Sequence, residues 1–176
     1  GYCLTKDPIF CQIAAKKIFK LKKVNFEFSK RALTINKQMP LVTFQKVKDF
    51  YNKKLKNKKF LIMGVSYKED INDTRHSPSE ILFRKLKSNN AIISVHDPIV
   101  PFWNELEINV LKSYPNINLF DAIIFTVKHD EYKKINFKKW INKKNILIVD
   151  SNNVLSEKQY KILKDKNCNL ISIGRG

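Results

Sequence analysis

The sequence predicts an α/β protein in which a helical segment with a long central helix precedes a Rossmann-like open parallel sheet. From Asp7 to about Leu55 the apolar residues recur at helical spacing. Beyond that point, short β-branched runs alternate with polar helical stretches, the pattern of buried parallel strands joined by helices. The lysine-rich stretch Asn52–Lys59 separates the two patterns. Residues 1–57 and 58–176 are therefore expected to form distinct units.

The helical part is expected to contain two helices. Asp7 and Pro8 predict the start of the first, with Asp7 as the cap and Pro8 at the first helical position. The second is expected to begin near Glu27 and to continue its apolar face to Leu55, with a kink or break at Pro40. A long helix with apolar residues on more than one side needs more than one neighbour, which favours a homodimer.

Five apolar, β-branched runs are predicted to be strands buried on both faces of a sheet. They are Phe60–Met63, Ile92–Val95, Ala122–Val127, Ile146–Val149 and Leu170–Ile173. Helices are expected at Pro78–Ser88, Phe102–Lys112, Glu131–Ile141 and Ser156–Lys166. This alternation predicts parallel strands joined by right-handed crossovers.

The composition excludes several classes of protein. With 43% hydrophobic and 11% aromatic residues the chain is globular, and no apolar run approaches the roughly 18 residues of a membrane span. The three cysteines, Cys3, Cys11 and Cys168, form no CxxC pair, so neither a disulfide framework nor a zinc site is expected. This cysteine usage favours a reducing, cytoplasmic setting. The first residues do not resemble a signal peptide, and without an initiator Met the chain is expected to begin inside a longer one.

The formal net charge of +18 suggests a phosphate-bearing partner, with nucleic acid as one alternative. Only four of the basic residues are Arg, the side chain suited to bidentate recognition of phosphate or guanine. The lysines are spread along the chain among many Asn and Ile residues. A solvated, lysine-rich surface is therefore favoured over a basic nucleic-acid-binding domain.

A ligand site is expected at the carboxyl end of the first strand, where doubly wound sheets bind ligands. The strand runs into Gly64–Lys68, and a polar loop then reaches Arg75. Ser77 is expected to cap the next helix, and Glu80 to complete a capping box. Lys68 and Arg75 would then lie beside a helix N-terminus that favours anions, so a phosphate-bearing ligand is predicted. No GxGxxG follows the strand, which argues against an ordinary dinucleotide site. A solvated loop with ordinary surface charges is the alternative.

A second candidate site is the segment from Cys3 to Asp7. Cys3 lies near Lys6 and a helix N-terminus, surroundings that favour a reactive thiolate. Asp7, four residues on, could orient water or act as a base. A purely structural cysteine segment is the alternative. A cysteine-protease arrangement needs a histidine base, and the histidines stand in loop-like contexts with ordinary explanations: His76, His96 and His129.

Six segments stand out in order along the chain: GYCLTKDP, RALTINKQMP, MGVSYKEDINDTRHSPSE, HDPIVPFW, VDSNNVL and IGRG. In this order they resemble motifs of the UDP-glucose/GDP-mannose dehydrogenase family. The first is similar to its catalytic cysteine segment, the second to its Ala-Arg…Ile-Asn…Met-Pro helix and the third to its Lys-x-x-x-x-Asp-x-Arg-x-Ser-Pro motif. The fourth matches its Asp-Pro-x-Val turn. The resemblance spans essentially the whole chain.

The resemblance implies the C-terminal part of an NAD-dependent nucleotide-sugar 6-dehydrogenase, with a UDP-sugar-binding domain at 58–176 and the N-terminal NAD-binding domain absent. Such enzymes oxidise the C6 alcohol of a UDP-hexose to the uronic acid with two NAD. Cys3 would capture the aldehyde as a thiohemiacetal and then hold a thioester, while Asp7 would position or activate the hydrolytic water.

The resemblance also assigns binding residues. Lys6 and Arg75 would approach the NAD, and Tyr67 and Lys68 would contact the sugar nucleotide. The family's second Gly-Arg motif, whose arginine reaches the sugar nucleotide, reads Asp-Ser-Asn-Asn at 150–153, so Asn152 is a departure. UDP-glucose and UDP-N-acetylhexosamines are the leading substrates. The chain alone is expected to be inactive, and a non-catalytic sugar-nucleotide-binding or dimerising fragment is the alternative.

Overall fold

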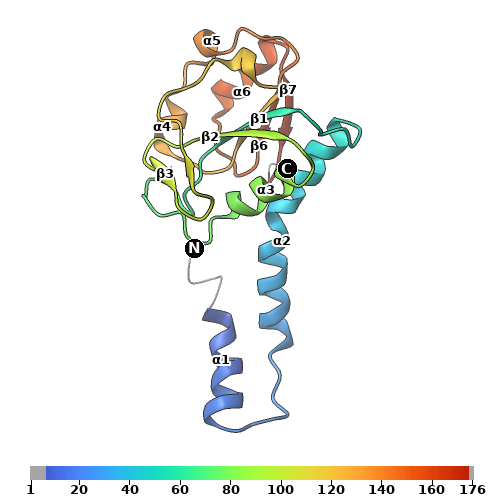
Figure 1. Ribbon diagram of the computed structural model, residues 1–176, viewed down its shortest axis with the longest axis vertical. Helices are drawn as coiled ribbons and strands as arrows, with labels where there is room; N and C mark the ends of the chain where they lie inside the picture. Colours follow the sequence, from blue (N-terminus) through green and yellow to red (C-terminus); the bar gives the residue numbers. More distant parts are fainter. Residues whose placement is uncertain (1–6, 175–176) are drawn as a thin grey trace.

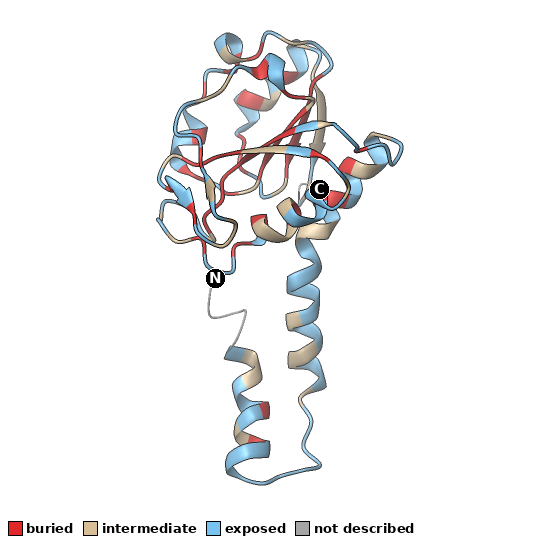
Figure 2. Cartoon of the chain, viewed as in Figure 1, coloured by how far each residue is buried: buried red, intermediate tan, exposed pale blue. Residues whose placement is uncertain are grey.

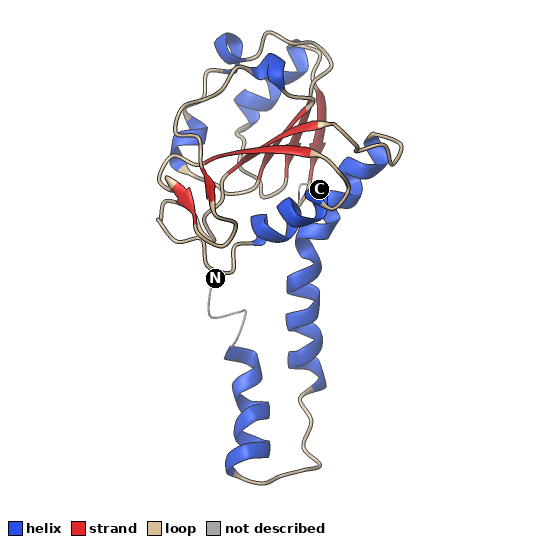
Figure 3. Cartoon of the chain, viewed as in Figure 1, coloured by secondary structure: helices blue, strands red, loops and turns tan. Residues whose placement is uncertain are grey.

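The computed structural model describes residues 7–174, which form a helical hairpin projecting from an α/β body (Figure 1). The strands of the body gather in one main sheet, and helices lie on both of its faces (Figure 3). The predicted class, a long helix followed by an open parallel sheet, is confirmed. Among residues 7–174, no helix combines the length and the apolar character that a bilayer crossing requires.

The first arm of the hairpin is an irregular helix. It consists of a 3-10 turn at Asp7–Ile9, α1 at Phe10–Ile13 and a π-helical turn at Ala14–Ile18. Gln12 joins the arms, because its amide donates to the Val24 carbonyl at 3.3 Å and its side-chain oxygen accepts from the Phe26 N–H at 2.9 Å. The helical character predicted after Asp7 is thus present, but in three short pieces.

The second arm is α2, which runs from Glu27 to Phe50 without the predicted break at Pro40. Proline removes one backbone hydrogen bond from the helix interior. Packing beyond that point offsets this loss, since Phe44 and Val47 are buried against the sheet. The helix ends before Leu55, which is buried in the loop that follows rather than on the helical face predicted for it.

Five parallel strands form the sheet in the order β2-β1-β5-β6-β7. They are β1 (Lys59–Met63), β2 (Ile92–His96), β5 (Ala122–Phe125), β6 (Leu147–Asp150) and β7 (Asn169–Ser172). All five predicted strands are confirmed, with bounds shifted by at most two residues. The strand order reverses at β1, because the chain first adds β2 on one side and then places β5 on the other.

Two apolar layers cover the sheet. The end of α2 and helix α3 (Pro78–Lys87) pack on one face, where the core includes Phe44, Leu82 and Leu86. The other face is covered by α4 (Asp130–Lys133), α5 (Phe137–Trp140) and α6 (Glu157–Asp165). Full burial of a large apolar side chain contributes about 1.5–3 kcal/mol, so these layers provide most of the stability. The core extends into α2, while the boundary near residue 57 stays a prediction.

Two predicted helices are wrong in detail. Phe102–Lys112 instead contains a small antiparallel ladder of β3 (Phe102–Trp103) and β4 (Ile108–Asn109). Phe102 is exposed and Trp103 buried, which is the two-residue period of a strand. The predicted helix at Glu131–Ile141 is split into α4 and α5 because Asn136 caps α5, its side chain accepting from the backbone of Lys139.

Candidate functional site

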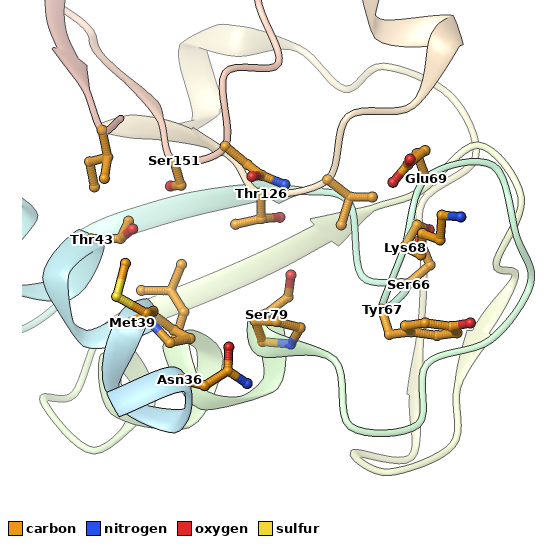
Figure 4. Close-up of a pocket in the computed structure, with 16 residues that line it drawn as sticks. Asn36, Met39, Thr43, Ser66, Tyr67, Lys68, Glu69, Ser79, Thr126 and Ser151 are labelled. Atoms are coloured by element: carbon orange, nitrogen blue, oxygen red, sulfur yellow. The ribbon is translucent and has the colours of Figure 1, made fainter. Parts of the chain in front are cut away.

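A cavity of about 240 Å³ opens beside the carboxyl ends of β1, β5 and β6 (Figure 4). Helix α2 lines one side with Asn36, Met39 and Thr43, and the loops after the three strands line the others. The strand order reverses between β1 and β5, the position at which open α/β sheets bind ligands. A cavity therefore lies where the sequence predicts a ligand site.

Gly64 directs the loop that leaves β1 towards this cavity. Its φ of +103° lies in the left-handed region that favours glycine, and an added Cβ would lie 2.5 Å from the Cβ of Val127. The Thr126 hydroxyl donates to the Gly64 carbonyl at 2.6 Å. Glycine at this position thus lets the ends of β1 and β5 approach closely.

Tyr67 and Lys68, the predicted sugar-nucleotide residues, both line this cavity and lie together at one end of it (Figure 4). Tyr67 is half-buried and Lys68 is exposed. The buried Ser66 hydroxyl donates to the Lys68 carbonyl at 2.7 Å, and the Tyr67 N–H donates to the Asp73 carbonyl at 2.9 Å. Local hydrogen bonds therefore shape the loop that presents these two side chains.

Arg75, the predicted NAD contact, is not among the residues that line the cavity. Its guanidinium forks onto Asp73, with Nη2 at 2.6 Å from Oδ2 and Nε at 3.0 Å from Oδ1. The hydrogen bonds from Arg75 lower the pKa of Asp73 to about 2. With 68% of its side chain exposed, Arg75 lies on the outer surface of the loop.

Ser77 caps α3, as predicted, and joins this helix to the cavity loop. Its hydroxyl oxygen accepts from the Ser79 N–H, and the hydroxyl donates to the Ser66 carbonyl, each at 3.2 Å. The predicted capping box is wrong because the Glu80 carboxylate receives the Arg84 guanidinium at 2.7 Å instead. The first turn of α3 lines the cavity, so its end of the helix dipole favours a negatively charged ligand there.

A buried histidine–aspartate pair supports the cavity loop, and the sequence interpretation, which treated His129 as structural, missed it. His129 Nε2 lies 3.0 Å from Asp97 Oδ2, and both side chains are completely buried. Burial opposes charge on either group, yet hydrogen bonding and mutual attraction lower the pKa of Asp97 and raise that of His129. Asp97 follows β2 and His129 follows β5, the two strands that flank β1, so the only sequence signal is that each residue comes soon after a predicted strand.

The loop after β6 closes another side of the cavity. Asp150 shapes this loop by accepting from the Val154 N–H at 2.8 Å and the Leu155 N–H at 3.1 Å. Ser151 and Asn152 line the cavity. Asn152, which differs from the arginine of the family motif, therefore lies at the predicted site. The buried Ser151 hydroxyl has no hydrogen-bond partner among residues 7–174. Buried polar groups usually have a hydrogen-bond partner, so this hydroxyl is an exception within the described part of the chain.

Two of the predicted catalytic and cofactor residues, Cys3 and Lys6, lie outside the described residues. Asp7 is the first residue of the 3-10 turn and is exposed. The structure therefore brings together Tyr67 and Lys68 and places Arg75 and Asp7 away from the cavity lining.

Comparison with known proteins gives a family match for the part of the chain that holds the cavity. The profile described as the UDP-binding domain of the UDP-glucose/GDP-mannose dehydrogenase family matches residues 61–157. A UDP-N-acetyl-D-mannosamine dehydrogenase of Methanococcus aeolicus is 29% identical over 183 aligned residues, covering 100% of this chain and 38% of the relative. A UDP-glucose 6-dehydrogenase of Rickettsia bellii is 26% identical, covering 88% of this chain and 36% of the relative.

Solved structures show the same fold. The NDP-N-acetyl-D-galactosaminuronic acid dehydrogenase of Methanosarcina mazei superposes with a TM-score of 0.82 at 23% identity, over 99% of this chain and 38% of that one. A UDP-glucose dehydrogenase of Pyrobaculum islandicum superposes with a TM-score of 0.70 at 20% identity, over 99% of this chain and 37% of that one. The chain thus spans somewhat more than a third of the length of the proteins it matches.

Proposed function

The chain belongs to the UDP-glucose/GDP-mannose dehydrogenase family, and we propose that its cavity binds the nucleotide of a UDP-sugar. The supporting observation is that most of the cavity residues lie within the part of the chain that matches the family's UDP-binding domain. The UDP-binding match covers residues 61–157, and the cavity residues contributed by the sheet loops and α3 fall within it, Ile173 excepted. The remaining wall comes from α2, which lies before the matched range.

The chemistry of the lining suits such a ligand. The lining offers neutral hydrogen-bonding groups, among them the exposed Asn36 amide and the Ser151 hydroxyl, which has no partner within residues 7–174; such groups suit a base and a ribose. Lys68 supplies a cation at the opening, and the first turn of α3 adds its helix dipole. A diphosphate between these groups would gain charge-assisted hydrogen bonds.

In the complete enzyme, the proposed reaction oxidises the C6 alcohol of a UDP-hexose to a carboxylate. The Cys3 thiolate adds to the aldehyde carbon formed by the first oxidation, and the resulting thiohemiacetal is oxidised to a thioester. Water, positioned by Asp7, then breaks the carbon–sulfur bond and releases the carboxylate. The substrate class includes UDP-glucose and UDP-N-acetylhexosamines. We also propose a cytoplasmic setting, in keeping with the free thiols of Cys11 and Cys168.

NAD is proposed as the hydride acceptor in both oxidations. The described residues do not form a dinucleotide site by themselves, because no glycine-rich turn follows β1 and Arg75 is held by Asp73 on the loop surface. NAD would therefore be bound mainly by protein beyond residues 7–174, with Lys6 and Arg75 approaching it.

The hairpin supports a second proposal, a homodimer. Apolar side chains are exposed along both arms, including Ile18 at 70% and Phe28 at 87% of their surface. A run of exposed apolar residues of this kind marks an interaction surface. A second copy of the chain would cover the two arms. Sedimentation equilibrium tests this, because a strictly monomeric chain at tens of micromolar would contradict it, and Phe28→Ser should weaken the association.

Calorimetric titration with UDP, repeated at low and high salt, tests the nucleotide proposal, with NAD alone as the comparison. Saturable UDP binding that largely survives salt supports a built site, whereas loss of the signal in salt indicates nonspecific attraction to the +18 charge. Lys68→Ala should weaken UDP binding about tenfold, as expected for one lost charge-assisted hydrogen bond. Lys158→Ala, an exposed lysine on α6, is the matched control. Equal affinity of the two variants would remove Lys68 from the site.

A further inference from the structure

We propose that His129 is a positioning residue for the nucleotide site. Its two ring nitrogens hold both ends of the 65–70 segment, which carries Tyr67 and Lys68, at the carboxyl edge of the sheet. The part of this proposal that concerns ligand affinity rests on the proposed UDP-sugar function. The part that concerns the loop does not.

The contacts of His129 converge on this segment. Nε2 lies 3.0 Å from Asp97 Oδ2 and 3.2 Å from Ser66 Oγ. On the other side of the ring, Nδ1 accepts from the Asp70 N–H at 3.0 Å. The imidazole therefore bridges the start and the end of the segment. Tyr67 and Lys68 lie between the two anchored points.

Asp97 extends the first anchor to the backbone. Its Oδ2 accepts from the Val65 N–H at 2.8 Å and from the Ser66 N–H at 3.3 Å, in addition to the contact with His129. Its Oδ1 accepts from the Ile99 and Val100 N–H groups at 3.0 Å each. The carboxylate is thus fixed by its own turn after β2, and it presents the other oxygen to the loop after β1.

The second anchor holds a backbone conformation that is unusual for a residue other than glycine. Asp70 has a φ of +57°, in the left-handed region. Its N–H is bound by His129, and its Oδ1 accepts from the Asp130 N–H at 3.1 Å. Both bonds come from the chain after β5, so the turn at Asp70 depends on contacts outside the loop itself.

Because Nδ1 of His129 accepts from the Asp70 N–H, the neutral ring carries its proton on Nε2. Gaining a second proton would turn Nδ1 into a donor towards Asp70 Oδ1, 3.3 Å away, at the expense of the backbone bond. The charge state of His129 thus determines which atom of Asp70 is held.

Several other titratable groups surround the ring of His129, and their titration would contribute to any pH dependence of ligand affinity. Tyr132 of α4 lies edge-on to it with ring centroids 5.4 Å apart, and its hydroxyl is 3.1 Å from Nδ1 of His96. Glu131 and Asp130 lie on the same short helix as Tyr132. Asp97 and Asp70 face the two ring nitrogens directly. A control that keeps these groups is therefore needed.

His96 provides the matched control. It is also fully buried, and its ring nitrogens contact the Tyr132 hydroxyl at 3.1 Å and the Lys112 carbonyl at 3.2 Å. No hydrogen bond of its side chain reaches the 65–70 segment. His96→Gln therefore perturbs the same core without touching the loop.

Two substitutions of His129 separate the anchors. In His129→Gln the side-chain amide nitrogen can take the place of Nε2 and donate to Asp97. In His129→Asn the side-chain oxygen can take the place of Nδ1 and accept from Asp70, while Asp97 loses its side-chain hydrogen-bond donor. We expect faster amide hydrogen exchange at residue 70 in the Gln variant and at residues 65 and 66 in the Asn variant, measured without ligand. Unchanged exchange in both variants, or the same change in His96→Gln, would overturn the proposal.

The ligand arm uses UDP-glucose, whose diphosphate is esterified at both ends and so does not itself titrate near neutral pH. His129→Asn should weaken its binding about tenfold, and His129→Gln less, because only the Asn variant removes the side-chain donor from the buried Asp97 carboxylate. The affinity of the wild type for UDP-glucose should change between pH 5 and 9, and this change should persist in His96→Gln and disappear in His129→Gln.

If wild-type protein binds no UDP-glucose, the proposed function fails for this chain while the exchange data still decide the loop proposal. If it binds but all variants share its affinity and pH profile, the positioning role is wrong and the binding function stands.

Discussion

The helical hairpin and the α/β body differ in where they place their apolar side chains. In the body the strands and the inner helix faces are buried, whereas most of the hairpin is exposed (Figure 2). The last third of α2 belongs to the body in this respect, because Thr43, Phe44 and Val47 are buried there. Farther from the sheet, the same helix exposes Phe28 and Ile35. One helix thus passes from a region stabilised within the chain to one whose apolar surface needs a partner.

Stability and function can therefore be tested separately in this chain. The body contains both apolar layers and most of the cavity lining, so it should determine the unfolding free energy and most of the UDP binding. The hairpin should determine association. Similar substitutions in the body and in the hairpin should therefore have different effects on unfolding free energy and on association. Equal effects would contradict this assignment.

The largest effect is expected at the close approach of β1 and β5. Gly64→Ala places a Cβ against Val127 in a left-handed backbone, and strain and overpacking together should cost about 4 kcal/mol of unfolding free energy. Gly174→Ala is the control, because its φ is +79° but nothing lies within 4 Å of the added carbon. Urea denaturation measures both. Equal losses would mean that backbone strain alone matters at Gly64.

A core substitution compares the two regions directly. Leu86 is fully buried between α3 and the sheet, so Leu86→Ala should cost about 3 kcal/mol through lost burial and the cavity it leaves. Ile35→Ala, on the half-exposed face of α2, should change unfolding by less than about 0.5 kcal/mol at concentrations where the chain is monomeric. A loss at Ile35 as large as at Leu86 would show that the hairpin face is already packed within one chain.

The sequence predicts the body better than its details because the body follows strong periodic signals. Each strand of the main sheet contains a short apolar run, and all five predicted strands are found. The ladder at Phe102–Trp103 and Ile108–Asn109 was missed because two-residue strands are too short to show a period. The break at Pro40 was predicted from local chemistry and is outweighed by packing distant in sequence.

The candidate site shows the same limit. A sequence motif carries Tyr67 and Lys68, which line the cavity, and their contact with a sugar nucleotide stays a prediction. His129 and Asp97 were missed as a pair because they lie 32 positions apart in sequence and meet only when β2, β1 and β5 are aligned. The sequence alone does not show that the side chains of His129 and Asp97 are in contact. The lack of a Ser151 partner within residues 7–174 likewise depends on its surroundings in the fold.

Two serines at the cavity sharpen the separation of stability from binding. The Ser79 hydroxyl donates to the Gly64 carbonyl at 3.0 Å, so Ser79→Ala should lose about 1 kcal/mol of unfolding free energy. The Ser151 hydroxyl has no partner within residues 7–174, so Ser151→Ala should leave unfolding within about 0.5 kcal/mol of wild type. The same Ser151 change should weaken UDP binding about fivefold if the hydroxyl meets the ligand. Unchanged affinity, measured by calorimetry, would place the nucleotide elsewhere in the cavity.

The smallest and most specific effect is the pH dependence contributed by His129 and Asp97. The folded-state pKa of His129 is raised, so its contribution is complete below the ordinary histidine pKa of about 6.5 and is lost as the pH rises through the raised value. The pKa of Asp97 is lowered, so its contribution is present above about 3.9 and is lost as the pH falls through the lowered value. The stability difference between wild type and His129→Gln should therefore be largest near pH 5 to 6 and should shrink towards pH 9. Denaturation series across this range measure it. A difference that grows with pH would mean that the neutral ring, held by the Asp70 N–H, is the form that the fold favours.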